Sequence, residues 1–319
     1  MTTFQRAATL TPLVILGSLY ALTLVHRPDM AGQAGPVFWA FVVALWLAAV
    51  AALSALSHVR LKRPLARKAA DLAVPVLFGA FLFFLWEVIV VGAGVPSVLM
   101  PAPSAIATRF ASSLPVLRDD FIQTFVKSVL SGYAIGCFSG FLVAIIADRV
   151  PFLRRGLLPL GNFVSALPVI GIAPIMVMWF GFDWPSKAAV VVVMTFFPML
   201  VNTVAGLAAT GRLERDLMHS YGAGYGPTLL KLRLPVALPF IFNALKINST
   251  LALIGAIVAE FFGTPIVGMG FRISIEVARM SLDMVWAEIA LAAIAGSAFY
   301  GLIALIERGA TFWHPSYRT

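Results

Sequence analysis

The sequence is poor in charged residues and has a single cysteine. Of its 319 residues, 12% are Asp, Glu, Lys or Arg, and 61% are hydrophobic. A typical soluble domain has about twice that charged fraction, so a water-soluble fold is excluded. Cys137 has no second cysteine to pair with, and it lies in an apolar run. It is therefore a small packing residue rather than half of a disulfide or a reactive thiol.

Motifs for nucleotide, metal or hydrolytic chemistry are also missing. No Gly is followed by Lys, so the chain lacks the G-x-x-x-x-G-K-[ST] loop that holds nucleotide phosphates. It has no H-E-x-x-H, and its four histidines lie in separate loops without metal-ligand spacing. The segment 136–140 has one residue too many for the G-x-S-G of membrane serine proteases. We therefore expect no catalytic residue, no metal site and no bound cofactor.

Long apolar runs are what the sequence has in quantity. A helix that crosses a bilayer needs about 20 mostly apolar residues. Eight stretches qualify: 8–25, 36–57, 73–95, 125–147, 156–180, 187–209, 238–262 and 285–307. They predict an all-α fold, a polytopic transmembrane helical bundle. The fifth stretch is interrupted by Pro159, Pro168 and Pro174.

The net charge of +9 is spread over short segments between the apolar runs. This distribution is typical of membrane insertion and not of a nucleic-acid-binding face, so no nucleic acid is expected as a partner. If the N-terminus is cytoplasmic, the inside segments hold roughly twice as many Lys and Arg as the outside ones. The first apolar run lacks a convincing cleavage site and is interpreted as a retained anchor. We predict a multi-pass protein of the bacterial cytoplasmic (inner) membrane with both termini cytoplasmic.

A basic segment at 58–71 is the sharpest change of composition in the chain. It separates the first two apolar stretches from the other six. We predict an accessory N-terminal hairpin with its basic cytoplasmic linker over residues 1–71. The remaining residues, 72–319, are predicted to form a six-helix core.

The long cytoplasmic loop 210–236 predicts a short amphipathic helix. Leu213, Leu217 and Tyr221 recur at i, i+4 and i+8, so they form one apolar stripe, and the charged residues lie off it. Gly222 is a natural stop, since glycine tolerates the left-handed conformation that ends many helices. A second helix is expected over 228–234, ended or kinked by Pro235 and Pro239. A helix too short to fold alone, with an apolar stripe, requires a partner.

This loop resembles the signature of the binding-protein-dependent permeases of ABC importers. That signature is Glu-Ala-Ala, three residues, Gly, nine residues, Ile, any residue and Leu-Pro. The matching residues are Asp216, Leu217, Met218, Gly222, Leu232, Leu234 and Pro235. The spacing is kept throughout, but the Glu-Ala-Ala triplet is degenerate, and a Gly-Pro pair at 226–227 interrupts the spacer.

Further segments are similar to two branches of that family. The segments 86–87, 99–104, 174–181, 259–260 and 268–271 resemble the nitrate, sulfonate and taurine branch. The segments 262–270 and 311–318 resemble relatives that carry pyrimidine or riboflavin-type vitamin precursors. Both substrate classes stay open at this point, because an external binding protein makes most of the selection in this family.

The resemblance implies a set of partners and a mechanism. The loop would act as a coupling helix in a groove of a separate ATPase, and a dimer of these subunits would hold ATP and Mg²⁺. An extracytoplasmic solute-binding protein would deliver the solute. A second permease copy, most simply a homodimer, would complete the path through the lipid bilayer.

Polar residues within the apolar stretches are candidates for the solute path or its gate, because ionisable groups are costly in a membrane. The candidates are Glu87, Asn202, Asn248 and Glu260. The alternative interpretation is that those near helix ends snorkel into interfacial water. Gly132, Gly136 and Gly140 recur every four residues and predict close helix packing.

Two other functional classes occur among polytopic membrane proteins of this size. A secondary transporter would need no ATPase and often shows inverted repeats, which this sequence lacks. An intramembrane enzyme would need a catalytic set, which is also missing. The loop signature favours the ABC permease over both.

Overall fold

The computed structural model describes residues 3–28, 30–59, 64–165, 167–263 and 266–313, and every regular element in these ranges is a helix. Six helices are long and apolar enough to cross a membrane, and residues 9–25 and 169–180 form shorter apolar helices. The predicted all-α polytopic fold is confirmed. Residues 60–63 of the basic linker and 314–318 of the C-terminal motif lie outside the described residues.

The chain forms two compact units, residues 1–112 with 280–286 and residues 113–279 with 287–319. The first unit contains α1 (Thr3–Val25), α2 (Pro36–Ser57), α3 (Pro64–Gly92) and α4 (Pro103–Ser112). Helices α1, α2 and α3 pack around one apolar cluster, which includes Val25, Phe38 and Val88. The two-helix hairpin therefore packs on α3, and residue 71 falls within α3. The functional division at residue 71 stays a prediction.

Two helices of the second unit are longer than a bilayer requires. α5 (Leu114–Phe121), the π-helical segment η1 (Ile122–Val129) and α6 (Leu130–Arg149) form one apolar helix of 36 residues. A second helix of 36 residues runs from Tyr225 to Glu260 and includes α12 (Leu234–Glu260). Each is about 54 Å long at 1.5 Å per residue, against a hydrocarbon core of about 30 Å. Their ends therefore extend beyond the hydrocarbon layer.

The fifth predicted stretch is not one spanning helix. Residues 151–180 form α7 (Pro151–Ser165) and α8 (Val169–Phe180), and neither reaches the length of a spanning helix. Pro168 lies at the start of α8 with extended backbone angles. A proline disfavours the helical conformation of the residue before it, which accounts for the break.

Helix α9 (Trp184–Ala208) packs against both α6 and α12. The glycines of α6 permit this contact, as the four-residue spacing predicted. A Cβ atom at Gly132 would lie 2.6 Å from the Ala188 carbonyl oxygen, and one at Gly140 would lie 2.5 Å from the Phe196 carbonyl oxygen. Both are below the distance that real Cβ atoms show, so the two backbones touch only because the side chains are absent.

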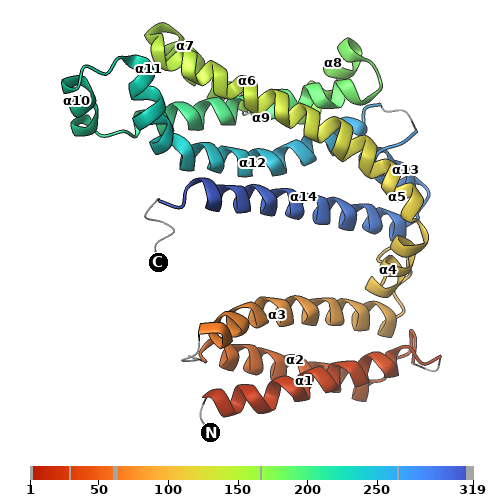
Figure 1. Ribbon diagram of the computed structural model, residues 1–319. Coiled ribbons are helices and arrows are strands. Elements are labelled where there is room, and N and C mark those ends of the chain that lie inside the picture. Colours follow the sequence, from red (N-terminus) through yellow and green to blue (C-terminus); the bar gives the residue numbers. More distant parts are fainter. Residues whose placement is uncertain (1–2, 29, 60–63, 166, 264–265, 314–319) are drawn as a thin grey trace. The chain divides into compact units, whose positions relative to one another are not determined.

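The functional elements lie at the two ends of these helices. In the second unit, α10 (Arg212–Ser220) and α7 lie at one end, and α8, α5 and α13 (Met269–Ala278) lie at the other (Figure 1). Helix α14 (Leu282–Ala310), through its residues 287–310, also belongs to this unit, where Phe299 contacts Phe125 and Tyr133. The ion pair between Lys246 and Glu307 links α12 to α14 at 2.7 Å.

Candidate functional site

Helix α10 carries the predicted apolar stripe on its surface. Leu213 and Tyr221 are each 81% exposed and Leu217 is 57% exposed, and α10 buries none of its side chains. Arg212, Glu214, Arg215, Asp216 and His219 are the charged or titratable residues of the same helix. The structure thus presents the exposed side chains of Leu213 and Leu217 on a largely polar helix of nine residues, and Tyr221 follows directly after it as the C-cap.

The end of α10 has the geometry that the sequence predicted at Gly222. Gly222 has φ +68°, in the left-handed region. Its amide donates to the His219 carbonyl at 2.9 Å, and the Ala223 amide donates to the Met218 carbonyl at 3.0 Å. These two bonds form a Schellman motif, which satisfies the last carbonyls of a helix and reverses the chain. Gly222 therefore fixes the direction in which the chain leaves α10.

The predicted second helix over 228–234 is part of a longer one. α11 (Tyr225–Thr228) passes through a π-helical turn, η2 (Leu229–Arg233), directly into α12. The expectation that Pro235 and Pro239 end this helix is wrong, because the helix continues past both prolines to Glu260, and the wide turn before Pro235 accommodates a residue without an N–H. The Leu234 amide donates to the Leu229 carbonyl across that turn. A kink at these prolines stays a prediction. Leu234 packs against a buried cluster around Leu207, and Leu232 is half-buried.

An ion pair at the base of this loop is not predicted by any motif in the sequence. Arg233 donates to both carboxylate oxygens of Asp148, from Nη1 at 2.6 Å and from Nη2 at 2.7 Å. The two residues are 85 positions apart, so no local pattern joins them.

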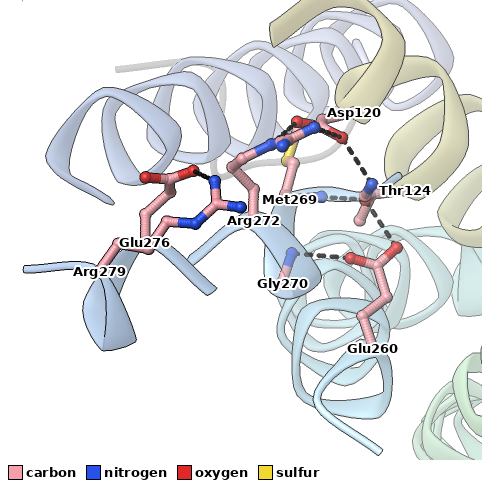
Figure 2. Close-up of polar contacts among 9 residues, drawn as sticks. Asp120, Thr124, Glu260, Met269, Gly270, Arg272, Glu276 and Arg279 are labelled. Carbon is pink, nitrogen blue, oxygen red and sulfur yellow. Dashed lines mark hydrogen bonds and ion pairs between the residues drawn. The ribbon is translucent and has the colours of Figure 1, made fainter. Parts of the chain in front are cut away.

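At the opposite end of the unit, Glu260 belongs to a set of side chains that caps the start of α13 (Figure 2). Three successive backbone amides are satisfied from other helices. Gly268 donates to Asp120 at 2.6 Å, Met269 to the Thr124 hydroxyl at 2.8 Å, and Gly270 to Glu260 at 2.7 Å. The Thr124 hydroxyl donates in turn to the other oxygen of Glu260, at 2.7 Å. The first amides of a helix lack partners within it, and carboxylates are favoured there by the helix dipole.

Burial decides between the two interpretations of Glu260. The residue is 2% exposed and both carboxylate oxygens accept hydrogen bonds, so it does not snorkel. Gly268 has φ +139°, and a Cβ atom there would lie 2.7 Å from a Glu260 carboxylate oxygen. The structure therefore places Glu260 as a brace of the turn before α13. A contact with the solute stays a prediction.

Neighbouring charges complete this end of the unit. Arg272 donates to Asp120 at 2.8 Å. Burial lowers the pKa of Arg272, whereas the hydrogen bond and the negative charge of Asp120 raise it. The second effect is larger, so the pKa of Arg272 lies above its usual value. Lys187 is 1% exposed and donates to the carbonyls of Phe182 and Gly263, which ties the start of α9 to the turn after Glu260. None of these contacts was predicted, because Asp120 is 152 positions from Arg272 and Lys187 is 76 positions from Gly263.

Asp183 begins α9 as its N-cap. Its carboxylate accepts hydrogen bonds from the Gln123 side chain at 2.8 Å and from the Trp184 amide at 2.7 Å. These two bonds hold the pKa of Asp183 below its usual value. The first of them ties the start of α9 to η1.

The other predicted path residues lie apart from Glu260. In the first unit, Glu87 accepts hydrogen bonds from the Ser104 amide at 2.9 Å and hydroxyl at 2.6 Å, so it caps α4 as Glu260 caps α13. It also contacts His26 at 3.0 Å. Asn202 donates to the Pro198 carbonyl within its own helix, and Asn248 donates to the Thr195 carbonyl across the contact between α12 and α9. The four candidates therefore form no common site within either unit.

Comparison with known proteins places the chain in a family. Residues 132–312, more than half of the chain, match the model of the binding-protein-dependent transport system inner membrane component family. The riboflavin transport system permease protein RibX of Chloroflexus aurantiacus is 29% identical over 77% of this chain and 91% of its own length. The formylaminopyrimidine transport permease protein ThiX of Halalkalibacterium halodurans is 34% identical over 59% of this chain and 75% of its own length.

A third relative represents the sulfonate branch. The putative aliphatic sulfonates transport permease protein SsuC of Bacillus subtilis is 26% identical over 76% of this chain and 88% of its own length. The matched family region contains α10, the ion pair at its base, α13 and Glu260, whereas the other two capping residues of α13, Asp120 and Thr124, precede it. The chain belongs to the family of inner-membrane components of binding-protein-dependent transport systems.

Proposed function

We propose that this chain is the permease subunit of an ATP-binding-cassette importer, and that α10 is the helix through which a separate ATPase drives it. The observation that carries this proposal is the uncovered apolar stripe of Leu213, Leu217 and Tyr221. It lies on a helix that projects at one end of the membrane-spanning helices (Figure 1).

Lipid is a poor occupant for this stripe. The same nine-residue helix carries Arg212, Glu214, Arg215 and Asp216, and taking such charges into hydrocarbon costs several kcal/mol. Burial of a Leu side chain in a protein groove contributes about 1.5 to 3 kcal/mol, while the flanking charges remain hydrated. A groove on a soluble subunit can therefore bury the apolar stripe of α10 while its charged residues remain in water.

The remaining parts of the proposal follow from the family. ATP and Mg²⁺ bind to a dimer of ATPase subunits, and this chain holds neither. A second copy of the chain completes the solute path, and an extracytoplasmic binding protein delivers the solute. Both termini lie on the cytoplasmic side of the inner membrane, in agreement with the distribution of Lys and Arg.

The proposed substrate is a small heteroaromatic vitamin precursor. RibX and ThiX are named for riboflavin and formylaminopyrimidine, and they match along most of their own lengths. The second candidate is a sulfonate-type anion, which the name of SsuC and the motifs at 86–87 and 99–104 support.

One uptake experiment tests both the ATP-driven import and the proposed substrate. Cells or proteoliposomes containing this chain, its ATPase and its binding protein are supplied with labelled riboflavin, formylaminopyrimidine or taurine. A matched preparation carries an ATPase whose phosphate-binding Lys is replaced. We expect uptake of a vitamin precursor that stops with the inactive ATPase. Uptake that continues with the inactive ATPase contradicts the importer, whereas ATP-dependent uptake of taurine alone contradicts only the substrate.

A further inference from the structure

The loop that carries α10 is held at both of its ends by polar side chains. It leaves α9 after Ala208 and returns at Tyr225. At the first end, Arg215 Nη2 donates to the Ala208 carbonyl at 2.9 Å, and Arg233 donates to the Leu207 carbonyl at 3.0 and 3.2 Å. The last carbonyls of a helix have no partner within it, so these guanidinium groups complete the end of α9.

At the second end, the same Arg233 joins the loop to α6. Its bidentate pair with Asp148 is almost fully enclosed, with side-chain exposures of 12% for Arg233 and 3% for Asp148. The Tyr225 hydroxyl donates to Asp148 at 3.1 Å, and the Arg149 guanidinium lies 5.4 Å from the centre of the Tyr225 ring. Asp148 therefore accepts three hydrogen bonds, all from the segment that returns from α10.

The placement of Asp148 argues against a role in the stability of α6 alone. It lies in the last turn of that helix, where the dipole disfavours an acidic side chain. Among the residues that the structure describes, Arg233 and Tyr225 supply the hydrogen bonds that stabilise an aspartate there. A bidentate arginine–carboxylate pair also fixes relative orientation, which a single contact with a lysine does not.

This pair connects the returning end of the α10 loop to the membrane-spanning helices, beside the direct bond from Arg215 to α9. Helix α10 buries none of its own side chains, so its position depends on the bond from Arg215 to Ala208 and on the two ends of its loop. Arg233 holds both ends at once, since it bonds α9 through Leu207 and α6 through Asp148 and lies in the turn that leads into α12. Three spanning helices meet at one guanidinium group.

We propose that Asp148 and Arg233 are a positioning pair for energy coupling. They make both ends of α10 and the adjoining ends of α6, α9 and α12 move as one body, so that a displacement of α10 is passed to the spanning helices. This inference rests on the proposed function, because it assigns the residues that transmit the movement an ATPase imposes on α10.

The test uses the complete transporter with its ATPase and binding protein in proteoliposomes. Asp148→Asn keeps the size of the side chain and weakens the ion pair, and Arg233→Lys keeps the charge but loses the bidentate geometry. The exchange D148R/R233D restores opposite charges in reverse order. Glu307→Gln is the matched control, because it breaks another enclosed ion pair of the same unit, which lies between α12 and α14. ATPase co-purification, ATP hydrolysis and uptake are measured on each sample.

We expect the single variants to retain the ATPase, since the apolar stripe is unchanged, and to hydrolyse ATP with little gain from the binding protein. Uptake per ATP should fall by at least about fivefold, the lower range of coupling between distant sites. The exchange variant should recover part of this loss, and Glu307→Gln should keep the wild-type ratio. If the single variants keep the wild-type ratio, or lose uptake and hydrolysis only in proportion to the amount of folded protein, the inference is wrong. Failure of the wild-type chain to bind any ATPase would instead overturn the proposed function.

A second measurement distinguishes positioning from stability. Spin labels on cysteines introduced at Ser220 and Ile146 report the distance between α10 and α6. The wild-type distance should stay the same with and without ATP, as expected of one body, and Asp148→Asn should broaden it. A wild-type distance that changes with ATP contradicts the proposal.

Discussion

The Glu260 carboxylate accepts a hydrogen bond at 2.7 Å from the amide of Gly270, ten residues further along the chain. This bond closes the turn between α12 and α13, and Thr124 and Asp120 satisfy the two preceding amides. In the first unit, Glu87 bonds the Ser104 amide near the start of α4 in the same manner. Two of the acidic residues that the sequence marked for the solute path thus cap short helices.

The first prediction concerns Glu260. Glu260→Ala removes both hydrogen bonds of a buried cap and leaves the Gly270 amide without its acceptor, which costs about 1 to 3 kcal/mol. Glu260→Gln keeps one acceptor and should cost less. We expect thermal unfolding of the purified protein to be shifted most by Ala, less by Gln, and least by the control Glu276→Gln on α13, whose partner Arg279 is 66% exposed in its side chain. Equal shifts for Glu260→Ala and Glu276→Gln would show that Glu260 is not a brace.

Gly222 provides the second prediction. Its φ of +68° lies in the left-handed region, and no heavy atom lies within 4 Å of a Cβ built there. The backbone conformation, and not the space around it, therefore limits which residue can replace Gly222. Gly222→Asn should retain most uptake, because Asn tolerates this region, whereas Gly222→Val should incur about 1 to 2 kcal/mol of strain and redirect the chain after α10. Uptake that is equally low in both variants would mean that size matters and not the backbone angle.

The third prediction is a dependence on pH. The pKa of Asp183 is lowered by its hydrogen bonds to Gln123 and to the Trp184 amide. A lowered pKa contributes stability above the unfolded-state value of about 3.9, and this contribution is lost as the pH falls through the folded-state value. Asp183→Asn should therefore reduce the loss of stability between neutral and acidic pH, as measured by chemical unfolding at each pH. The mutant and the wild type should converge at the acidic end, and parallel curves would contradict the assignment.

The fourth prediction concerns the N-terminal hairpin. A chain beginning at residue 58 loses the contact between His26 and Glu87 and the backbone bonds from Gly32 and Ala34 to Val91 and Gly92. It should insert with reduced stability but still bind the ATPase and support uptake, because α10 and its base lie in the other unit. Loss of all uptake by a normally inserted chain would make the hairpin part of the transport path.

Local patterns predicted the surface helix well. The spacing of Leu213, Leu217 and Tyr221 and the stop at Gly222 depend on neighbours within one or two turns, and the structure confirms both. The course of the chain after Gly222 was predicted less well. Pro235 indicates a break when it is considered alone, but a π-helical turn lets the helix continue.

The partners of the charged residues were beyond prediction from one sequence. Asp120 and Arg272 are 152 positions apart, and Asp148 and Arg233 are 85 apart. Asp148 and Arg149 stand together at a helix end, as charged residues commonly do, so neither was singled out. Only the packing of α6, α9 and α12 brings Asp148 to Arg233.

The most direct test of this account is the affinity of the detergent-solubilised chain for its purified ATPase, measured for Leu217→Asp and for the off-stripe control His219→Asp. If the stripe is the docking surface, Leu217→Asp should weaken binding by about tenfold or more, since one buried Leu contributes about 1.5 to 3 kcal/mol. His219→Asp should stay close to the wild type. Equal affinity for the wild type and Leu217→Asp would contradict the claim that α10 receives the ATPase.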